Sequence, residues 1–277
     1  MMTYVKSAMI AMGCVLLLAM VATADETEDL AKQSQNPIAN LISLPFEFKA
    51  SFNAGSENNT IYSMDVKPVY PANLGDWLLI NRFIIPVIYQ EKLEEGQGSK
   101  FGLGNINYQA FFTPAEAGNI IWGVGPSIYL PTNTDDRLGV DQWSAGPAAV
   151  ALATPGHWLF GILAQNIWSI TGEDDEPDVH FFSAQLFINY NLDDGWYLTS
   201  SPTFVADWEA DSDNTWTVPI GGGVGRLVRF GNQPVDFKVQ SFWNAEHPDN
   251  TPDWSVQFLS LIHISEPTRP RRQSRNP

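Results

Sequence analysis

Polar and apolar residues alternate along most of the chain after residue 43. In the stretch 44–52 the even positions are all apolar, and three of the four odd positions are polar. The same period of two recurs in 61–70, 180–191 and 235–244. A period of two places successive side chains on opposite faces of a β-strand, whereas a helix would gather apolar residues at i, i+3 and i+4. These stretches are therefore predicted to be strands with one apolar and one polar face.

Segments of this kind follow one another, and their connections alternate in length. Short connections such as Gly75-Asp76 and Asp193-Asp194-Gly195 contain the residues that tight hairpins need. Longer polar connections lie between them, as at 132–142 and 208–215. Short turns at one end and long loops at the other are typical of outer-membrane barrels. The predicted strands are 44–53, 60–74, 77–91, 101–115, 120–131, 143–154, 158–171, 179–192, 196–207, 216–230, 233–246 and 253–258.

This pattern predicts an all-β fold: a transmembrane antiparallel up-and-down β-barrel of about 12 strands, with short periplasmic turns and longer, acidic outer loops. Six prolines fall inside the predicted strands, where we expect bulges or bends because proline has no N–H to donate. They are Pro68, Pro86, Pro126, Pro147, Pro202 and Pro219.

The Trp residues fit this topology, because all 10 lie near a predicted strand end. An indole there can bury its ring in lipid and keep its N–H in water. Trp77, Trp122, Trp158 and Trp196 would lie at the periplasmic end, and Trp143, Trp168, Trp208, Trp216, Trp243 and Trp254 at the outer end. Alternation alone also fits a soluble β-sandwich, in which the apolar faces are buried between two sheets. The long strands and the aromatic apolar face favour the barrel.

The first 24 residues are typical of a secretory signal. Lys6 precedes an apolar run at 8–21, and Ala22-Thr23-Ala24 is a small-x-small cleavage site. The run is shorter than the ~20 residues that span a membrane. We therefore expect export to the bacterial outer membrane, a periplasmic N-terminal segment at 25–42 and the barrel at 43–258.

The other end of the chain breaks the strand pattern. Residues 259–277, LSLIHISEPTRPRRQSRNP, contain four of the 15 Lys and Arg residues. They resemble the translation of a sequencing-library adapter, so we expect a non-native tail. The alternative is a genuine basic tail.

Composition excludes several classes of function. A net charge of −16 over 277 residues removes the basic surface that nucleic-acid binding requires. The one Cys, Cys14, lies in the predicted signal, which excludes disulfide scaffolds and Cys-based zinc sites. With 44% hydrophobic residues the chain is not a disordered acidic protein. We expect no cofactor and no metal.

Several motifs resemble a known group of proteins. They are LISLPF at 41–46, WLLINRFIIPVIYQ at 77–90, FGLGN at 101–105, IWGVGPSIYLPTNTDD at 121–136, WSAGPAAVAL at 143–152 and DWEA at 207–210. These motifs resemble the bacterial outer-membrane barrels labelled "neuromedin U" or "transporter", which are similar to the barrel family named for the meta-cleavage pathway of phenol degradation. The resemblance implies a membrane β-barrel with a transport role, and it supplies no settled substrate and no catalytic residues. By analogy with the family, hydrophobic or aromatic small solutes are candidates. This chain departs from the family at its C-terminus, where the family ends on an aromatic residue.

Charged side chains in the strands fall mostly on the polar face, which in a barrel lines the lumen. The candidate lumen residues are Glu47, Lys49, Asp65, Lys67, Arg82, Asp207, Arg229, Asp236 and Lys238. If the first two strands pair with positions summing to 114, Lys49 lies opposite Asp65 and Glu47 opposite Lys67, which cross-strand attraction favours. The set is either a selectivity lining for polar or anionic solutes or an ion-pair network that fills a narrow lumen.

Two further chemistries are considered. Acidic residues gather in outer loops at 135–141, 173–178 and 209–213, but their spacing does not match an EF-hand, so a solvated rim is expected. A membrane phospholipase would need Ser and His together. His180 and Ser183 have opposite parity and should face opposite sides of their strand, so no enzyme is expected.

The sequence thus predicts an outer-membrane channel for passive passage of small solutes. The alternative is a structural or surface-binding barrel with a plugged lumen. The expected partners are outer-membrane lipid and lipopolysaccharide, the solute, and the barrel-assembly machinery during insertion.

Overall fold

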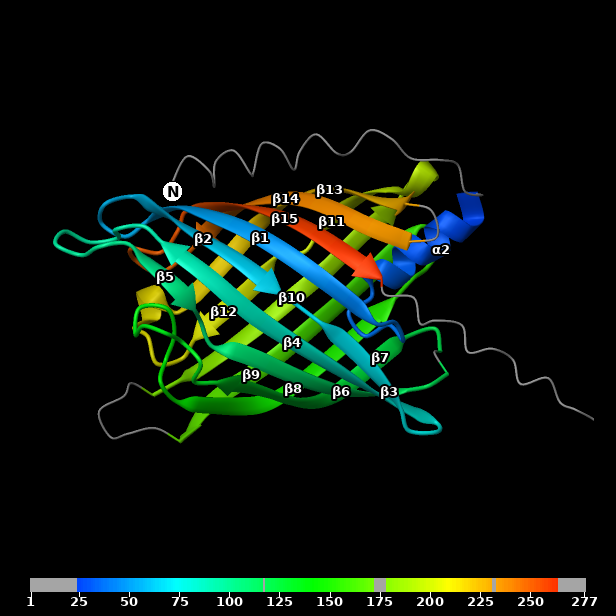
Figure 1. Ribbon diagram of the computed structural model, residues 1–277, viewed down its shortest axis with the longest axis horizontal. Coiled ribbons are helices and arrows are strands. Elements are labelled where there is room, and N and C mark those ends of the chain that lie inside the picture. Colours follow the sequence, from blue (N-terminus) through cyan, green and yellow to red (C-terminus); the bar gives the residue numbers. More distant parts are fainter. Residues whose placement is uncertain (1–23, 117, 172–177, 231–232, 264–277) are drawn as a thin grey trace, which may run out of the picture.

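A computed structural model describes residues 24–116, 118–171, 178–230 and 233–263. Within them the chain curls one antiparallel sheet into a closed barrel, with a helix, α2 (Ala24–Gln35), at one end (Figure 1). The strands are β1 (Ser43–Ala54), β2 (Asn59–Val66), β3 (Val69–Asn73), β4 (Trp77–Gln90), β5 (Lys100–Leu103), β6 (Ile106–Pro114), β7 (Ile121–Leu130), β8 (Trp143–Ala153), β9 (Trp158–Thr171), β10 (His180–Asn191), β11 (Trp196–Ser200), β12 (Thr203–Asp207), β13 (Trp216–Phe230), β14 (Gln233–Glu246) and β15 (Trp254–His263).

These 15 strands fill twelve positions around the barrel. Three positions are each shared by two strands. The strands β2 and β3 share one position beside β4, and β5 and β6 share the position on its other side. The strands β11 and β12 share the position between β10 and β13. The pairs β9–β10 and β15–β1 complete the ring. A closed ring satisfies the backbone groups between neighbouring strands, as a bilayer requires. The predicted twelve-stranded antiparallel barrel is confirmed, and the sandwich alternative is excluded.

Proline causes two of the interruptions within a position. Pro68 separates β2 from β3, and Pro202 separates β11 from β12. Both residues still accept hydrogen bonds across the break, Pro68 from the N–H of Phe83 and Pro202 from the N–H of Leu186, each at 3.0 Å. Pro219 lies at a register shift in the β13–β14 pair. The expected bends are therefore confirmed at these three prolines, while Pro86, Pro126 and Pro147 lie within continuous strands.

The Trp side chains lie on the outside of the barrel. All ten are between 38% and 60% exposed. At the outer end Trp168, His180 and Trp208 follow one another with ring centroids 5.4 and 6.3 Å apart; at the other end Trp77 meets Trp122 edge-on at 6.0 Å. In a sandwich these rings would be buried between sheets. Their exposure shows that the apolar face of the strands is the outer face.

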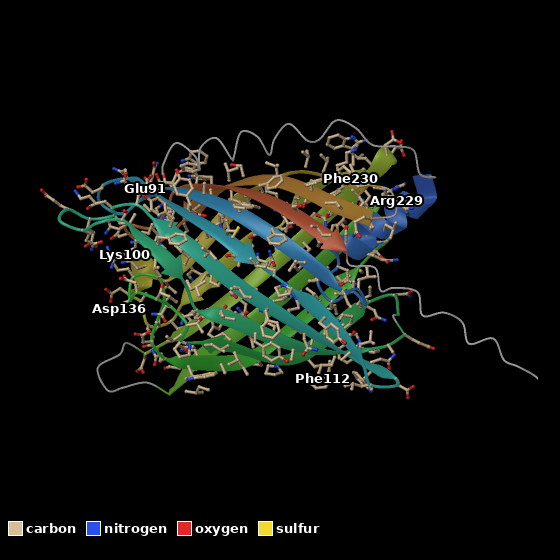
Figure 2. All side chains as sticks on the ribbon, in the orientation of Figure 1. Glu91, Lys100, Phe112, Asp136, Arg229 and Phe230 are labelled. Carbon is tan, nitrogen blue, oxygen red and sulfur yellow. The ribbon has the colours of Figure 1, made fainter. Side chains whose placement is uncertain are left out.

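The long loops and the short turns lie at opposite ends of the barrel (Figure 1). Figure 2 shows Glu91, Lys100 and Asp136 at the loop end, and Arg229 and Phe230 near α2 at the other end. Among the described residues no helix is long and apolar enough to cross a membrane.

The last strand runs further than predicted. β15 continues to His263, and residues 259–263 pair with the start of β1. That the tail 259–277 is non-native stays a prediction. The predicted signal up to residue 23, the turn Gly231-Asn232 and residues 264–277 lie outside the described residues.

Candidate functional site

The N-terminal segment, residues 24–42, lies at one mouth of the barrel, and we call it the plug. Helix α2 lies across this mouth (Figure 1). The Gln35 side chain donates to Asn191 Oδ1 at 2.8 Å and accepts from Asn189 Nδ2 at 3.2 Å. The Ser34 hydroxyl, which donates to the carbonyl of Ala31 at 2.8 Å, lies 3.3 Å from Asp236 Oδ2. These contacts join the plug to β10 and β14 from inside the barrel.

Ile38 fixes the plug to an apolar patch of the lumen. Its side chain is 2% exposed and belongs to a buried cluster from β3, β4, β6, β8, β9 and β10. The cluster, which we call the apolar wall, consists of Val69, Leu78, Ile80, Phe111, Ala148, Val150, Leu152, Leu159, Leu163 and Phe187. A lumen that is polar all round was expected, and this expectation is wrong here. In 78–80 of β4 and 147–152 of β8 both faces are apolar, so alternation could not show which of these side chains point inward.

The opposite side of the lumen is polar. Lys67 Nζ lies 2.9 Å from Glu47 Oε1 and 3.4 Å from Asp65 Oδ2. Asp236 accepts two contacts from the Tyr197 hydroxyl, at 2.8 and 2.9 Å. We call this side, formed by β1, the end of β2, β11 and β14, the polar wall. Ion pairs hold Lys67 against its two acids and hydrogen bonds hold Asp236, which lowers the cost of burying these groups.

The register of the first two strands differs from the predicted one. Glu47 lies opposite Asp65, and Lys49 lies opposite Ser63, so the predicted pairs Lys49–Asp65 and Glu47–Lys67 are not direct neighbours across the strands. The long Lys67 side chain instead reaches diagonally to both carboxylates. Because one flexible cation reaches two acids, attraction between charges does not require direct opposition.

Some of the candidate lumen residues line a common cavity, and the others lie apart from it. Glu47, Lys67, Arg82, Asp236 and Lys238 line one cavity of about 110 Å³ beside the plug. Lys49 is exposed and makes no ion pair with the described residues. Asp207 is exposed at the outer end of β12, and Arg229 lies at the opposite end of the barrel, near α2 (Figure 2).

Uncharged side chains complete a polar layer that sequence reasoning missed. Arg82 donates to Gln109 at 2.9 Å, Gln109 donates to Gln165 at 3.1 Å, and Gln165 donates to Tyr129 at 3.0 Å and Ser183 at 3.1 Å. The chain of hydrogen bonds runs from β4 to β10 across the lumen. Gln109 and Gln165 are buried, and an amide next to apolar residues in the middle of each strand was the signal for them.

The structure also places the residues of the two other candidate chemistries, a Ser–His pair and acidic metal ligands. His180 stacks on Trp168 at the outside, while Ser183 accepts a hydrogen bond in the lumen, so the two face opposite sides as predicted. Among the described residues no group of three or more His, Cys, Asp or Glu side chains is placed to hold a metal. The acidic positions Glu173, Asp174, Asp175 and Glu176 lie outside the described residues.

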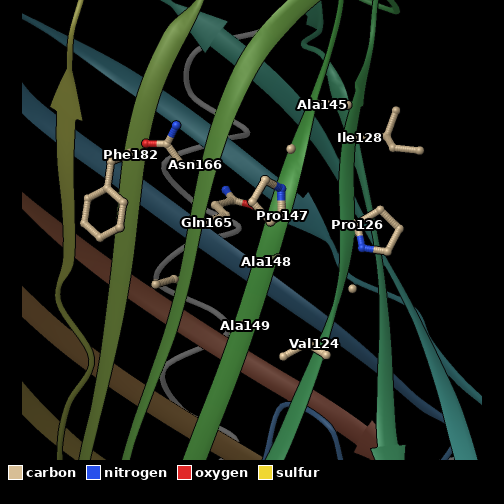
Figure 3. Close-up of a pocket in the computed structure, with 13 residues that line it drawn as sticks. Val124, Pro126, Ile128, Ala145, Pro147, Ala148, Ala149, Gln165, Asn166 and Phe182 are labelled. Atoms are coloured by element: carbon tan, nitrogen blue, oxygen red, sulfur yellow. The ribbon is translucent and has the colours of Figure 1, made fainter.

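The outer wall carries a shallow apolar groove of about 790 Å³ over β7, β8 and β9 (Figure 3). Small residues such as Ala145, Gly146 and Ala149 form its floor, and Pro126 lies directly opposite Pro147 in the β7–β8 pair. Lipid chains would fill such a groove in a bilayer.

No protein-family profile matches the chain, and no curated protein matches it. Several solved structures match the fold of the chain. The COG4313 outer membrane channel from Pseudomonas putida F1 matches with a TM-score of 0.64 and 15% identity, over 83% of this chain and 97% of that one.

Two further structures match less well. The outer membrane phospholipase OMPLA of Salmonella typhi has a TM-score of 0.43 at 14% identity, over 88% of this chain and 99% of that one. The P. putida toluene transporter TodX has a TM-score of 0.40 at 10% identity, over 84% and 91%. These scores are too low to bear on this chain. The COG4313 match shows the fold alone, a closed antiparallel β-barrel like that of an outer-membrane protein.

Proposed function

We propose that the chain is an outer-membrane channel that passes small solutes when its plug leaves the lumen. The observation that carries this proposal is the insertion of Ile38 into the apolar wall, which places part of the plug inside the lumen. The cavity beside the plug, about 110 Å³, is too small to be a path for most solutes. This small volume supports passage that depends on movement of the plug.

The outward-facing Trp residues support the membrane location. Exposed indoles at both strand ends match the two aromatic belts of a membrane barrel. The even number of strand positions puts both chain ends at the short-turn end, the periplasmic side of such barrels, and the plug enters from this end.

The two walls suggest the class of solute. When Ile38 withdraws, it leaves an apolar surface on one side and paired charges on the other. A small, partly apolar or aromatic solute can replace the Ile38 contacts, whereas a fully hydrated ion gains nothing from that wall. This favours hydrophobic or aromatic solutes.

Planar-bilayer recording of two variants tests the proposal. Ile38→Asp puts a charge into the apolar wall and should release the plug, giving discrete conductance steps that are rare in the wild type. Asn40→Asp adds the same charge two residues away, where the side chain is exposed, and should behave like the wild type.

The alternative function is a structural or surface-binding barrel with a permanently plugged lumen. Heat-modifiable gel migration reports whether each variant is folded. If Ile38→Asp migrates as a folded barrel and stays silent in the bilayer, the channel proposal is wrong and the plugged barrel is supported.

A further inference from the structure

One arginine stands on the lipid-facing side of the barrel. Arg226 lies on β13 between Gly225 and Leu227. Val224, two residues earlier, is exposed on the outer face. A side chain added at Gly225 would collide with the ring of Tyr197 inside the lumen. Since successive side chains alternate, Arg226 points outward.

The partner of Arg226 is an aromatic ring at the periplasmic strand ends. Trp196 lies directly opposite Arg226 in the β11–β13 pair, and the guanidinium carbon is 4.9 Å from the centroid of its ring. Trp196 is itself 40% exposed. A guanidinium stacked on an indole keeps its plane fixed while its N–H groups point past the ring edge.

The charge of Arg226 is not neutralised by the protein. Its Nε is buried and has no hydrogen-bond partner, and no carboxylate of the described residues lies within ion-pair distance. Arg229 Nε also lacks a hydrogen-bond partner, but Arg229 has lumen parity, as do Lys49, Arg82 and Lys238, while Lys100 pairs with Asp135 in an outer loop. Arg226 therefore differs from these residues in facing lipid.

A cation on the lipid face is unfavourable unless it meets an anion. Arg at the midplane of a barrel wall costs about 2–4 kcal/mol, and the cost falls towards zero at the membrane interface. Trp196 belongs to the periplasmic Trp row, so Arg226 lies close to the level where phospholipid phosphates begin. A phosphate accepts two parallel N–H bonds from a guanidinium.

We propose that Arg226, stacked on Trp196, binds the phosphate of a phospholipid headgroup in the periplasmic leaflet. The acyl chains of that lipid would lie along the apolar strip formed by Val224, Phe237 and Val239, which surrounds Arg226 on the outer face. The site rests on the membrane orientation given above and not on conduction, so a silent channel leaves it intact.

Native mass spectrometry of the folded barrel, titrated with phosphatidylglycerol in detergent, tests the site. Arg226→Met should weaken the apparent affinity at least fivefold, and Arg226→Lys, which keeps the charge but loses the fork of donors, should lie between. The matched control is Arg229→Met, which removes the same charge from the same strand on the lumen side. It should bind like the wild type. Equal binding by Arg226→Met, or equal loss in both Met variants, overturns the proposal.

Competition identifies the source of the phosphate. Dioleoylglycerol, which has the chains without the phosphate, should not displace phosphatidylglycerol. Inorganic phosphate at millimolar concentration should displace it poorly, because it lacks the chains. Displacement by inorganic phosphate at the same concentration as lipid would show a general anion site and overturn the lipid assignment. Stronger retention of lipopolysaccharide than of phosphatidylglycerol would contradict the periplasmic leaflet.

Discussion

The plug is held between two walls of different chemistry. On the apolar wall Ile38 packs among side chains that include Phe111 and Leu159, both 0% exposed. On the polar wall the plug contact is Ser34 with Asp236, and the wall itself is held by Lys67 with its two carboxylates and by Tyr197 with Asp236. The first wall resembles the core of a soluble protein, and the second resembles a network of paired charges.

The two walls differ in how much free energy their contacts contribute and in how strictly the contacts fix one geometry. Apolar packing is strong but tolerates many arrangements, whereas hydrogen bonds and ion pairs contribute less net free energy but demand one geometry. The apolar wall should therefore account for most of the stability of the closed barrel. The polar contacts should set the position in which the plug docks.

The largest expected effect is on the apolar wall. Phe111→Ala should lower the free energy of unfolding by about 3–5 kcal/mol, because it leaves a cavity in a packed cluster. Its neighbour Phe112 faces outward and is 43% exposed. Phe112→Ala should cost about 2 kcal/mol, since lipid fills the gap and only the transfer contribution is lost. Denaturant unfolding in micelles, followed by Trp fluorescence, measures both, and equal losses would mean that the apolar wall is not a packed core.

A smaller effect is expected on the polar wall. Lys67→Met leaves Glu47 and Asp65 facing each other without a cation. Removing one partner of a fully buried pair costs about 3–5 kcal/mol; these side chains keep 16–21% exposure, so we expect about 2 kcal/mol. Lys49→Met removes a lysine from the same lumen without breaking an ion pair and should change stability by less than about 0.5 kcal/mol. The same unfolding assay compares them, and a neutral Lys67→Met would show that the two acids need no cation.

The strands could be predicted because lipid imposes a strict rule on them. Every second residue must be apolar where acyl chains touch the wall, and β9, β13 and β14 have the predicted bounds, 158–171, 216–230 and 233–246. The rule says nothing where both faces are apolar. Phe111 and Phe112 are adjacent and identical in type, and only the three-dimensional structure shows that one faces the lumen and the other faces lipid.

The candidate site was predicted less completely for the same reason. The charged lumen residues could be identified because they stand among apolar neighbours. The predicted register of the first two strands differs from the observed one by two residues, because it assumed that opposite charges lie directly opposite each other, whereas Lys67 reaches Glu47 diagonally. Ile38 lies in a segment without periodicity, so no pattern marked it. Arg226 could have been found, since it is a charged residue among the apolar positions Val224 and Val228.

The smallest effect concerns the docking of the plug. Gln35→Ala removes two amide hydrogen bonds, to Asn189 and Asn191, which should cost about 1 kcal/mol and raise the population of the undocked plug about fivefold. Trypsin cleavage after Lys32, which lies in α2, reports that population when docking is fast relative to cleavage. Gln33→Ala, in the same helix but exposed, is the matched control and should cleave at the wild-type rate. If both variants are cleaved at that rate, the amide contacts do not hold the plug, and Ile38 alone fixes it against the apolar wall.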